Sequence, residues 1–122
     1  MSSPSSNPFF ISLREAKDMI TRYNTERPKM LAPGYENSLV LSEKFDRFPF
    51  DTLLGKTSCA GLRLYYGMDE NLVVSIIAVA VNQNGDDILP GTAAESTSAD
   101  DGHIVERGLP CPPYCPAIGL NP

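Results

Sequence analysis

Apolar positions recur with a helical period near the start of the chain. Four of them are spaced by three or four residues, with charged side chains on the opposite face: Leu13, Ala16, Ile20 and Tyr23. This period predicts an amphipathic helix over residues 13–25. Ser12 and Glu15 fit a capping box, in which the Ser12 hydroxyl accepts from the N–H of Glu15. We expect Pro28 to end the helix, because a residue before proline is steered away from the helical region.

The middle of the chain changes to strand patterns. Leu62, Leu64 and Tyr66 alternate with Arg63 and Tyr65, which predicts a half-buried strand with one wet face. The run from Leu72 to Asn82 is apolar on both faces, so it predicts a central strand covered on two sides. Asn84-Gly85 then predicts a type I′ hairpin, followed by a short strand from Asp86 to Leu89.

Two shorter elements precede these strands. Leu39–Leu41 is a candidate strand, and "FPFDTLLG" is typical of a helix of about two turns. Pro49 suits the first turn of that helix, and Gly55 is placed for its C-terminal cap. The expected fold is therefore α+β, with an antiparallel sheet of three or four strands packed against the N-terminal helix and a Pro-rich C-terminal tail.

The doubly apolar central strand raises the question of what covers its second face. The N-terminal helix can cover one face only. The second short helix, the C-terminal segment or another subunit could cover the other. The small side chains of Ala78 and Ala80 allow close approach there, so a homodimer through this surface is one expected arrangement.

Composition divides the chain into three parts. Residues 1–8 are rich in serine and proline and predict a disordered leader. Residues 9–89 carry the helix and strand patterns and predict a single α+β domain. Residues 90–122 combine prolines and glycines with an acidic, linker-like stretch, and predict a linker and a Pro/Cys tail.

Length and charge narrow the functional class. A chain of 122 residues with 42% hydrophobic residues has room for one core. Its net charge of −5 argues against a nucleic-acid partner. The N-terminus does not have the pattern of a secretory signal, and no apolar run approaches the roughly 20 residues that span a bilayer. We therefore expect a cytoplasmic protein without membrane association, where three cysteines disfavour a structural disulfide.

The C-terminal "CPPYC" is the main candidate for chemistry. Cys111, Cys115, Cys59 and His103 together make a Cys3His set, the number of ligands in a closed structural zinc site. The paired C-x2-C spacing of strong zinc signatures is missing. Cys59 also fits a small buried apolar residue, and His103 a solvated loop residue. The leading interpretation needs no cofactor, and only the alternative interpretation needs zinc.

Geometry separates the uses of the two tail cysteines. As polyproline II, the segment would hold the Cα atoms of Cys111 and Cys115 about 12 Å apart, whereas a disulfide needs them within roughly 7 Å. The segment must bend, through a turn or a cis Pro112–Pro113 bond, or the sulfurs cannot meet. A redox pair would also need a following helix to depress a thiol pKa, which the prolines disfavour.

Docking is the remaining use of the tail. Arg107-x-x-Pro110-x-x-Pro113 matches the pattern of proline-rich ligands. We expect Pro112, Pro113 and Tyr114 to act in interaction with a protein partner.

Catalytic patterns are not found. The single histidine stands in a linker-like segment, and neither phosphate-binding glycine motif is present. No catalytic residue is therefore predicted. Arg63 and Tyr65, on the wet face of one strand, are an exposed polar pair that also fits an ordinary cross-strand contact.

The layout from "CAGLRLYYGMDENLVVSIIAVAVNQNGDDIL" to "CPPYC" resembles a group of small bacterial proteins of the Bacteroidetes kind, which have no known activity. The resemblance covers about residues 45–116. It implies that the tail cysteines are a recurring feature, and it implies no catalytic or binding residue.

These patterns predict a small non-catalytic cytoplasmic protein that acts through protein–protein association. The alternative is a structural zinc-binding or thiol–disulfide module that uses Cys111 and Cys115.

Overall fold

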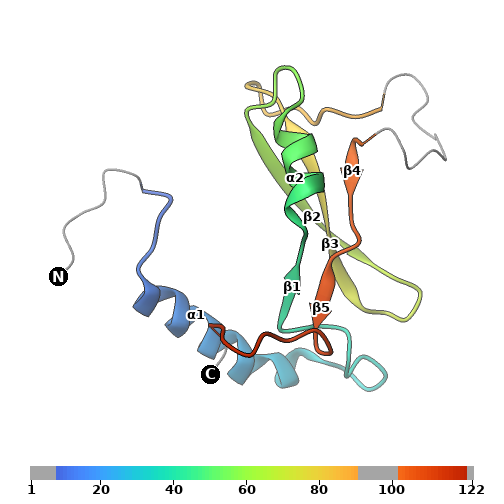
Figure 1. The fold of residues 1–122 in the computed structure, drawn as a ribbon. Helices are drawn as coiled ribbons and strands as arrows, with labels where there is room; N and C mark the ends of the chain where they lie inside the picture. Colours follow the sequence, from blue (N-terminus) through green and yellow to red (C-terminus); the bar gives the residue numbers. More distant parts are fainter. Residues whose placement is uncertain (1–7, 91–101, 121–122) are drawn as a thin grey trace. The chain divides into compact units, whose positions relative to one another are not determined.

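The computed structural model describes residues 8–90 and 102–120 and shows a mixed α+β fold with two antiparallel sheets (Figure 1). The chain divides into two compact units, residues 1–36 with 116–122 and residues 37–115, and each is described by itself. Residues 1–7, 91–101 and 121–122 lie outside the described part, which excludes most of the predicted leader and much of the predicted linker. Within the described residues, no helix is long and apolar enough to cross a membrane.

The first unit contains helix α1, Leu13–Glu26, which confirms the predicted amphipathic helix. The Ser12 hydroxyl accepts from the N–H of Glu15 at 3.0 Å, as the capping box requires. A 3₁₀ helix, Arg27–Met30, follows directly. Pro28 fits its first turn because that position needs no N–H donor. The predicted packing of α1 on a sheet stays a prediction.

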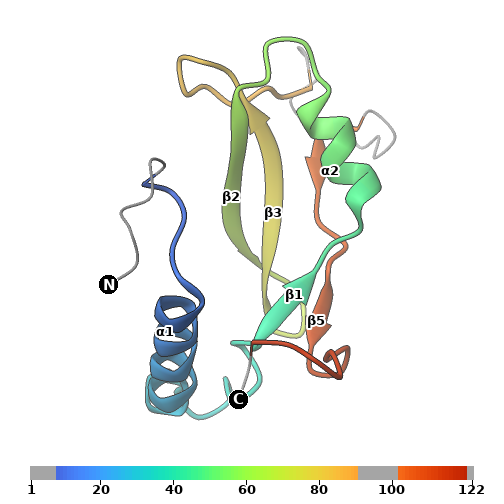
Figure 2. The same cartoon turned by 60° about the vertical axis from the view of Figure 1, so that its left-hand side comes forward.

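The second unit is built on a three-stranded sheet. Strands β2 (Gly61–Met68), β3 (Val74–Val81) and β4 (Ile104–Val105) are antiparallel in the order β2-β3-β4. β2 and β3 form a long hairpin in continuous register from Gly61↔Val81 to Met68↔Val74 (Figure 2). Both strands were predicted from the sequence, and the structure confirms them.

Helix α2, Arg47–Leu54, covers one face of this sheet. Its Leu53 is fully buried against Ala78 and Ala80 of β3, with Phe50, Leu62 and Val105 packed around them. The two alanines give the helix room to approach, and the Gly55 N–H closes the helix on the Asp51 carbonyl at 2.9 Å. The second short helix, one of the three expected covers, therefore occupies the Ala78 and Ala80 surface, for which a homodimer was one alternative.

The turn after β3 differs from the predicted type I′ hairpin. Gly85 has a φ of +85°, but Asn84 is not among the residues with positive φ. The Asn82 side chain instead holds the turn, because its oxygen accepts from the N–H groups of Asn84 at 2.9 Å and Asp86 at 3.0 Å. The predicted strand Asp86–Leu89 is reduced to an isolated bridge between Val81 and Asp87.

The second sheet pairs β1 (Ser42–Lys44) with β5 (Leu109–Cys111). The strand predicted at Leu39–Leu41 is displaced, since β1 begins after it. β4 and β5 both come from the region predicted as linker and tail. Their pairing partners lie far away in the chain, and short segments of two or three residues have no readable alternation.

Candidate functional site

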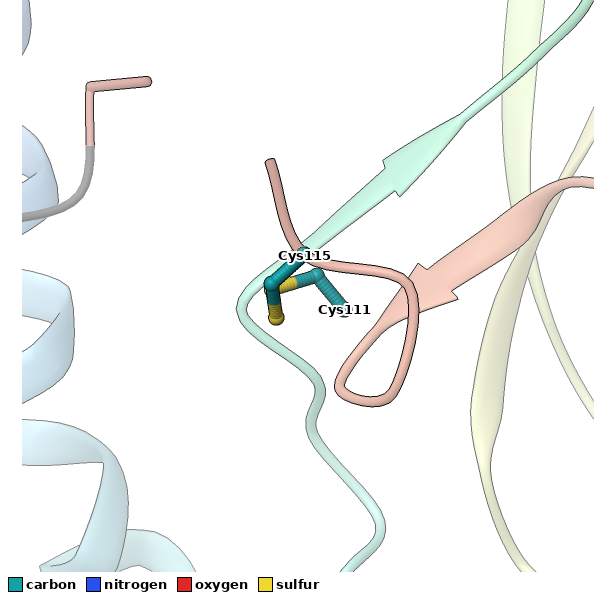
Figure 3. The surroundings of a disulfide bond; sticks show 2 residues. All are labelled: Cys111 and Cys115. Atoms are coloured by element: carbon teal, nitrogen blue, oxygen red, sulfur yellow. A yellow bond between two sulfur atoms is a disulfide. The ribbon is translucent and has the colours of Figure 1, made fainter. Parts of the chain in front are cut away.

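The two tail cysteines are joined in a disulfide that closes a small loop at the end of β5 (Figure 3). The Cα atoms of Cys111 and Cys115 are 4.6 Å apart, so the segment bends. The peptide bonds before Pro112 and Pro113 are both cis. The expectation that a structural disulfide is disfavoured was therefore wrong.

Hydrogen bonds anchor the base of the loop to the β1–β5 sheet. The Leu41 N–H donates to the Cys111 carbonyl at 2.8 Å, and the Tyr114 N–H donates to the Pro110 carbonyl at 2.9 Å. Cys111 itself is buried. Pro112 and Pro113 have no N–H to donate, so the strand cannot continue through them and the chain turns outward.

The tip of the loop is exposed and uncharged. Pro112, Pro113 and Tyr114 all face solvent, and Tyr114 keeps 58% of its surface accessible. These are the residues predicted for interaction. The proline-rich ligand interpretation was wrong, because Leu109–Cys111 is a paired strand and the next residues form a closed loop instead of an extended polyproline helix.

The four predicted zinc ligands do not come together in this structure. Cys59 packs against the Leu53–Ala78–Ala80 core, and His103 precedes Ile104, which pairs with Val79. Both therefore lie toward the end of β3. Cys111 pairs with Ser42, next to Glu43, whose carboxylate reaches Ile76 nearer the start of β3. At about 3.3 Å per strand residue, Cys59 and His103 are separated from Cys111 by roughly 10 to 20 Å.

Zinc binding stays a prediction. In residues 8–90 and 102–120, no group of three or more His, Cys, Asp or Glu side chains is arranged for a metal ion. A thiolate is the form of cysteine that ligates zinc, so Cys111 and Cys115 would have to be reduced first.

Cys59 is a free cysteine beside a polar hollow. A cavity of about 390 Å³ is lined by Ser58, Cys59, Asn82, Gln83 and Asn84. The Cys59 thiol donates to the carbonyl of Gly61 at 3.4 Å. The thiol is therefore tied to the start of β2, as a structural cysteine would be.

Glu43 joins the loop-bearing sheet to β3. Its carboxylate accepts from the Ile76 N–H at 3.1 Å, on a stretch of β3 that β4 does not pair. Gly108 makes room for it, since a Cβ there would lie 2.5 Å from the Glu43 Cγ. Burial raises the pKa of Glu43 and the charge of Glu106 raises it further, against the opposing effect of the Ile76 N–H.

Arg63 and Tyr65 share a carboxylate that sequence analysis missed. The Tyr65 hydroxyl and the Arg63 guanidinium donate to the two oxygens of Asp87, and Arg63 also donates to the Gly85 carbonyl at 3.0 Å. The bond from Tyr65, with help from Arg63, lowers the pKa of Asp87. The same bond to Asp87 raises the pKa of Tyr65.

This cluster pairs its charges internally. The guanidinium and the carboxylate neutralise one another, and the phenol is held as a donor, so none of the three is poised as a general base. Its effect is to fasten the segment after the turn to β2. Asp87 lies in the predicted strand Asp86–Leu89, and the Val81↔Asp87 bridge brings its carboxylate beside Arg63.

No family model matches the chain, and comparisons with curated proteins and with solved structures find no match. The resemblance to small bacterial proteins stays a prediction. The candidate site is therefore defined by geometry alone, as the disulfide-closed loop formed by residues 111–115.

Proposed function

We propose that this protein is a small non-catalytic binding protein that docks another protein through the tip of its disulfide-closed loop. One observation carries the proposal: Pro112, Pro113 and Tyr114 are exposed, while the strand from which they project is paired, and one of the two loop cysteines is buried. The base of the loop is therefore fixed by strand pairing, and its tip is accessible to a partner.

Such a loop suits recognition for an energetic reason. Binding costs less when the binding residues are already ordered, and ring closure removes freedom that an open tail would lose on association. An exposed tyrosine beside apolar side chains is typical of binding hot spots. The matching partner surface is a shallow apolar pocket with an acceptor for the Tyr114 hydroxyl.

Photo-crosslinking tests this docking directly. A benzophenone amino acid placed at position 114 should form an adduct of defined mass in cells that make the protein. The matched control is the same probe at Phe48 of α2, which is 78% exposed. The adduct should be absent at position 48. It should also be lost from position 114 in the Cys111→Ala/Cys115→Ala variant. Equal adducts at both positions, or an adduct that survives opening of the loop, would contradict loop docking.

Thiol–disulfide exchange is a second candidate, supported by the unequal exposure of the two sulfurs. Cys115 is exposed and Cys111 is buried. An attacking thiolate would therefore bond to Cys115 and release Cys111 as a thiolate. Equilibration with glutathione buffers tests this function. Opening within the range of cellular glutathione supports exchange, and resistance throughout that range supports a purely structural bond.

The cellular compartment of the protein is linked to the Cys111–Cys115 disulfide. The predicted cytoplasmic location stays a prediction, and a persistent disulfide favours an oxidising compartment. Alkylation of thiols in intact cells distinguishes the two. A reduced pair would support the cytoplasm and leave both cysteines available as zinc ligands.

A further inference from the structure

The outer edge of β2 presents a row of backbone groups that no other strand of the described residues pairs. β2 has eight residues and pairs along its whole length with β3. Within residues 8–90 and 102–120, β2 is the terminal strand of its sheet. A strand with one unpaired side is a template for another strand.

The pairing of β3 identifies which backbone groups of β2 face outward. Three even-numbered residues of β3 bond away from β2: the Val74 N–H to the Ser38 carbonyl, the Ile76 N–H to Glu43, and the Ala80 carbonyl to the Ile88 N–H. Backbone groups alternate in direction along a strand, so the odd-numbered residues of β3 bond to β2. In this register their partners are odd-numbered too, and the even-numbered residues of β2 turn their N–H and C=O groups to the open edge.

The same even-numbered positions carry exposed apolar side chains. Leu64 keeps 49% of its surface exposed, Tyr66 82% and Met68 52%. β2 contains no proline and no lysine, the residues that commonly protect an edge strand from association. Unpaired backbone groups and apolar side chains therefore lie along one line.

We propose that this edge pairs in antiparallel fashion with β2 of a second copy of the chain. The sequence of β2 is self-complementary about Tyr65. With Tyr65 opposite its symmetry mate, Leu64 faces Tyr66 and Leu62 faces Met68, so all cross-strand pairs on that side are apolar. A two-fold axis repeats each of these contacts.

Charge favours the same register. Arg63 is the one charged residue of β2, and Asp87 already neutralises it. Centring the pair on Tyr65 places Arg63 opposite Gly67, whereas centring it on Arg63 would bring two guanidinium groups face to face. The pairing would join two three-stranded sheets into one of six strands. It does not involve residues 111–115, so it stands apart from the proposed docking function.

Charge-swap variants test this register on the full chain with its disulfide intact. The double variant Leu64→Lys/Tyr66→Lys places an ammonium group at position 64 opposite another at position 66 of the second copy, and Leu64→Glu/Tyr66→Glu does the same with carboxylates. Each variant alone should raise the dimer dissociation constant at least about tenfold in sedimentation experiments, because two pairs of like charges are created. An equal mixture of the two variants should restore dimers.

Three results would overturn the proposal. They are a native chain that stays monomeric at millimolar concentration, a mixture that fails to restore dimers, and an equal loss of dimers in the exposed α2 control Phe48→Lys. Amide exchange identifies any other occupant. Exchange at Leu64 and Tyr66 should slow as protein concentration rises, and protection independent of concentration would mean that another segment of the same chain covers this edge.

Discussion

The β2–β3 hairpin and the β1–β5 pair are both antiparallel, yet different interactions hold them. The hairpin joins strands separated by a short turn and packs its alanines under Leu53 of α2. The β1–β5 pair joins Ser42 to Cys111 across most of the chain, over three residues per strand. Closing a longer loop costs more entropy, so such a short pair needs additional fastening. The Leu41 N–H, which donates to the Cys111 carbonyl, and the Glu43 carboxylate, which accepts from the Ile76 N–H, provide it.

The comparison explains where binding residues can stand. The hairpin has a local register and a helix over one face, which leaves it a long regular edge. In the β1–β5 pair only Cys111 is buried, and the disulfide closes the exposed loop that follows β5. Each region therefore offers a surface, one made of backbone groups and one of side chains.

Removing the core beneath the hairpin should have the largest effect. Leu53→Ala leaves a cavity against Ala78 and Ala80, and we expect a loss of about 2–5 kcal/mol in the free energy of unfolding. Urea denaturation followed by circular dichroism measures it. The matched control is Leu54→Ala, because Leu54 is the next residue of the helix and its side chain is 53% exposed. Equal losses in the two variants would show that α2 does not pack through Leu53.

Opening the loop should come next. Cys111→Ala/Cys115→Ala removes a crosslink at a sequence separation of 4, for which loop entropy gives about 2 kcal/mol. Amide exchange at Leu41 and Tyr114 should accelerate more than exchange within β3, because their acceptors lie at the base of the loop. Cys59→Ala serves as the control without a crosslink. Uniform acceleration across both sheets would erase the distinction between the two regions.

A side chain at position 108 should loosen the joint between the two sheets. Gly108→Ala pushes on Glu43 and should cost about 1–3 kcal/mol, with faster exchange of the Ile76 amide. Gly61→Ala is the matched control, since its added Cβ would meet only Val81 at an ordinary 3.7 Å. Adding Glu43→Ala to Gly108→Ala should recover part of the lost free energy of unfolding, because the crowded side chain is removed. An unchanged loss would mean that the added methyl group crowds a residue other than Glu43.

Glu43 should make the free energy of unfolding depend on pH through its contact between β1 and β3. Its pKa is raised above the usual 4.5, so the folded state holds the proton more tightly than the unfolded state. Stability from this group is present below pH 4.5 and is lost as the pH rises through the folded pKa. Glu43→Gln should flatten the unfolding free energy across that window, as measured by urea titrations. A profile parallel to that of the native chain would contradict the burial of Glu43.

Asp87 should show the opposite and smallest effect. Its pKa is lowered from 3.8, so its contribution is present above that value and is lost as the pH falls through the folded pKa. The contribution that Asp87→Asn removes should be small, since solvent screens a pair whose Arg63 side chain is 43% exposed. Tyr65→Phe should shift the Asp87 pKa upward in carbon-detected NMR titrations. An unchanged pKa would mean that the Tyr65 hydroxyl does not hold this carboxylate.

The length of each element determined whether it could be predicted from the sequence. α1, α2, β2 and β3 carry apolar periods of several residues, and all four were found. β4 and β5 are too short for a period, and β5 forms only when Ser42 meets Cys111. Pro112, Pro113 and Tyr114, which the sequence predicted for interaction, are exposed, and their role in interaction stays a prediction. The disulfide below them was missed, because cysteine number and compartment outweighed the chain's capacity to bend.

Thiol counting tests the account most directly. The purified chain, denatured without reductant and treated with iodoacetamide, should gain one carbamidomethyl group, at Cys59. After reduction it should gain three. Peptide mapping should find residues 111–115 as a crosslinked segment in the first sample. Three modified cysteines without reductant would contradict the closed loop, and with it the proposed docking surface.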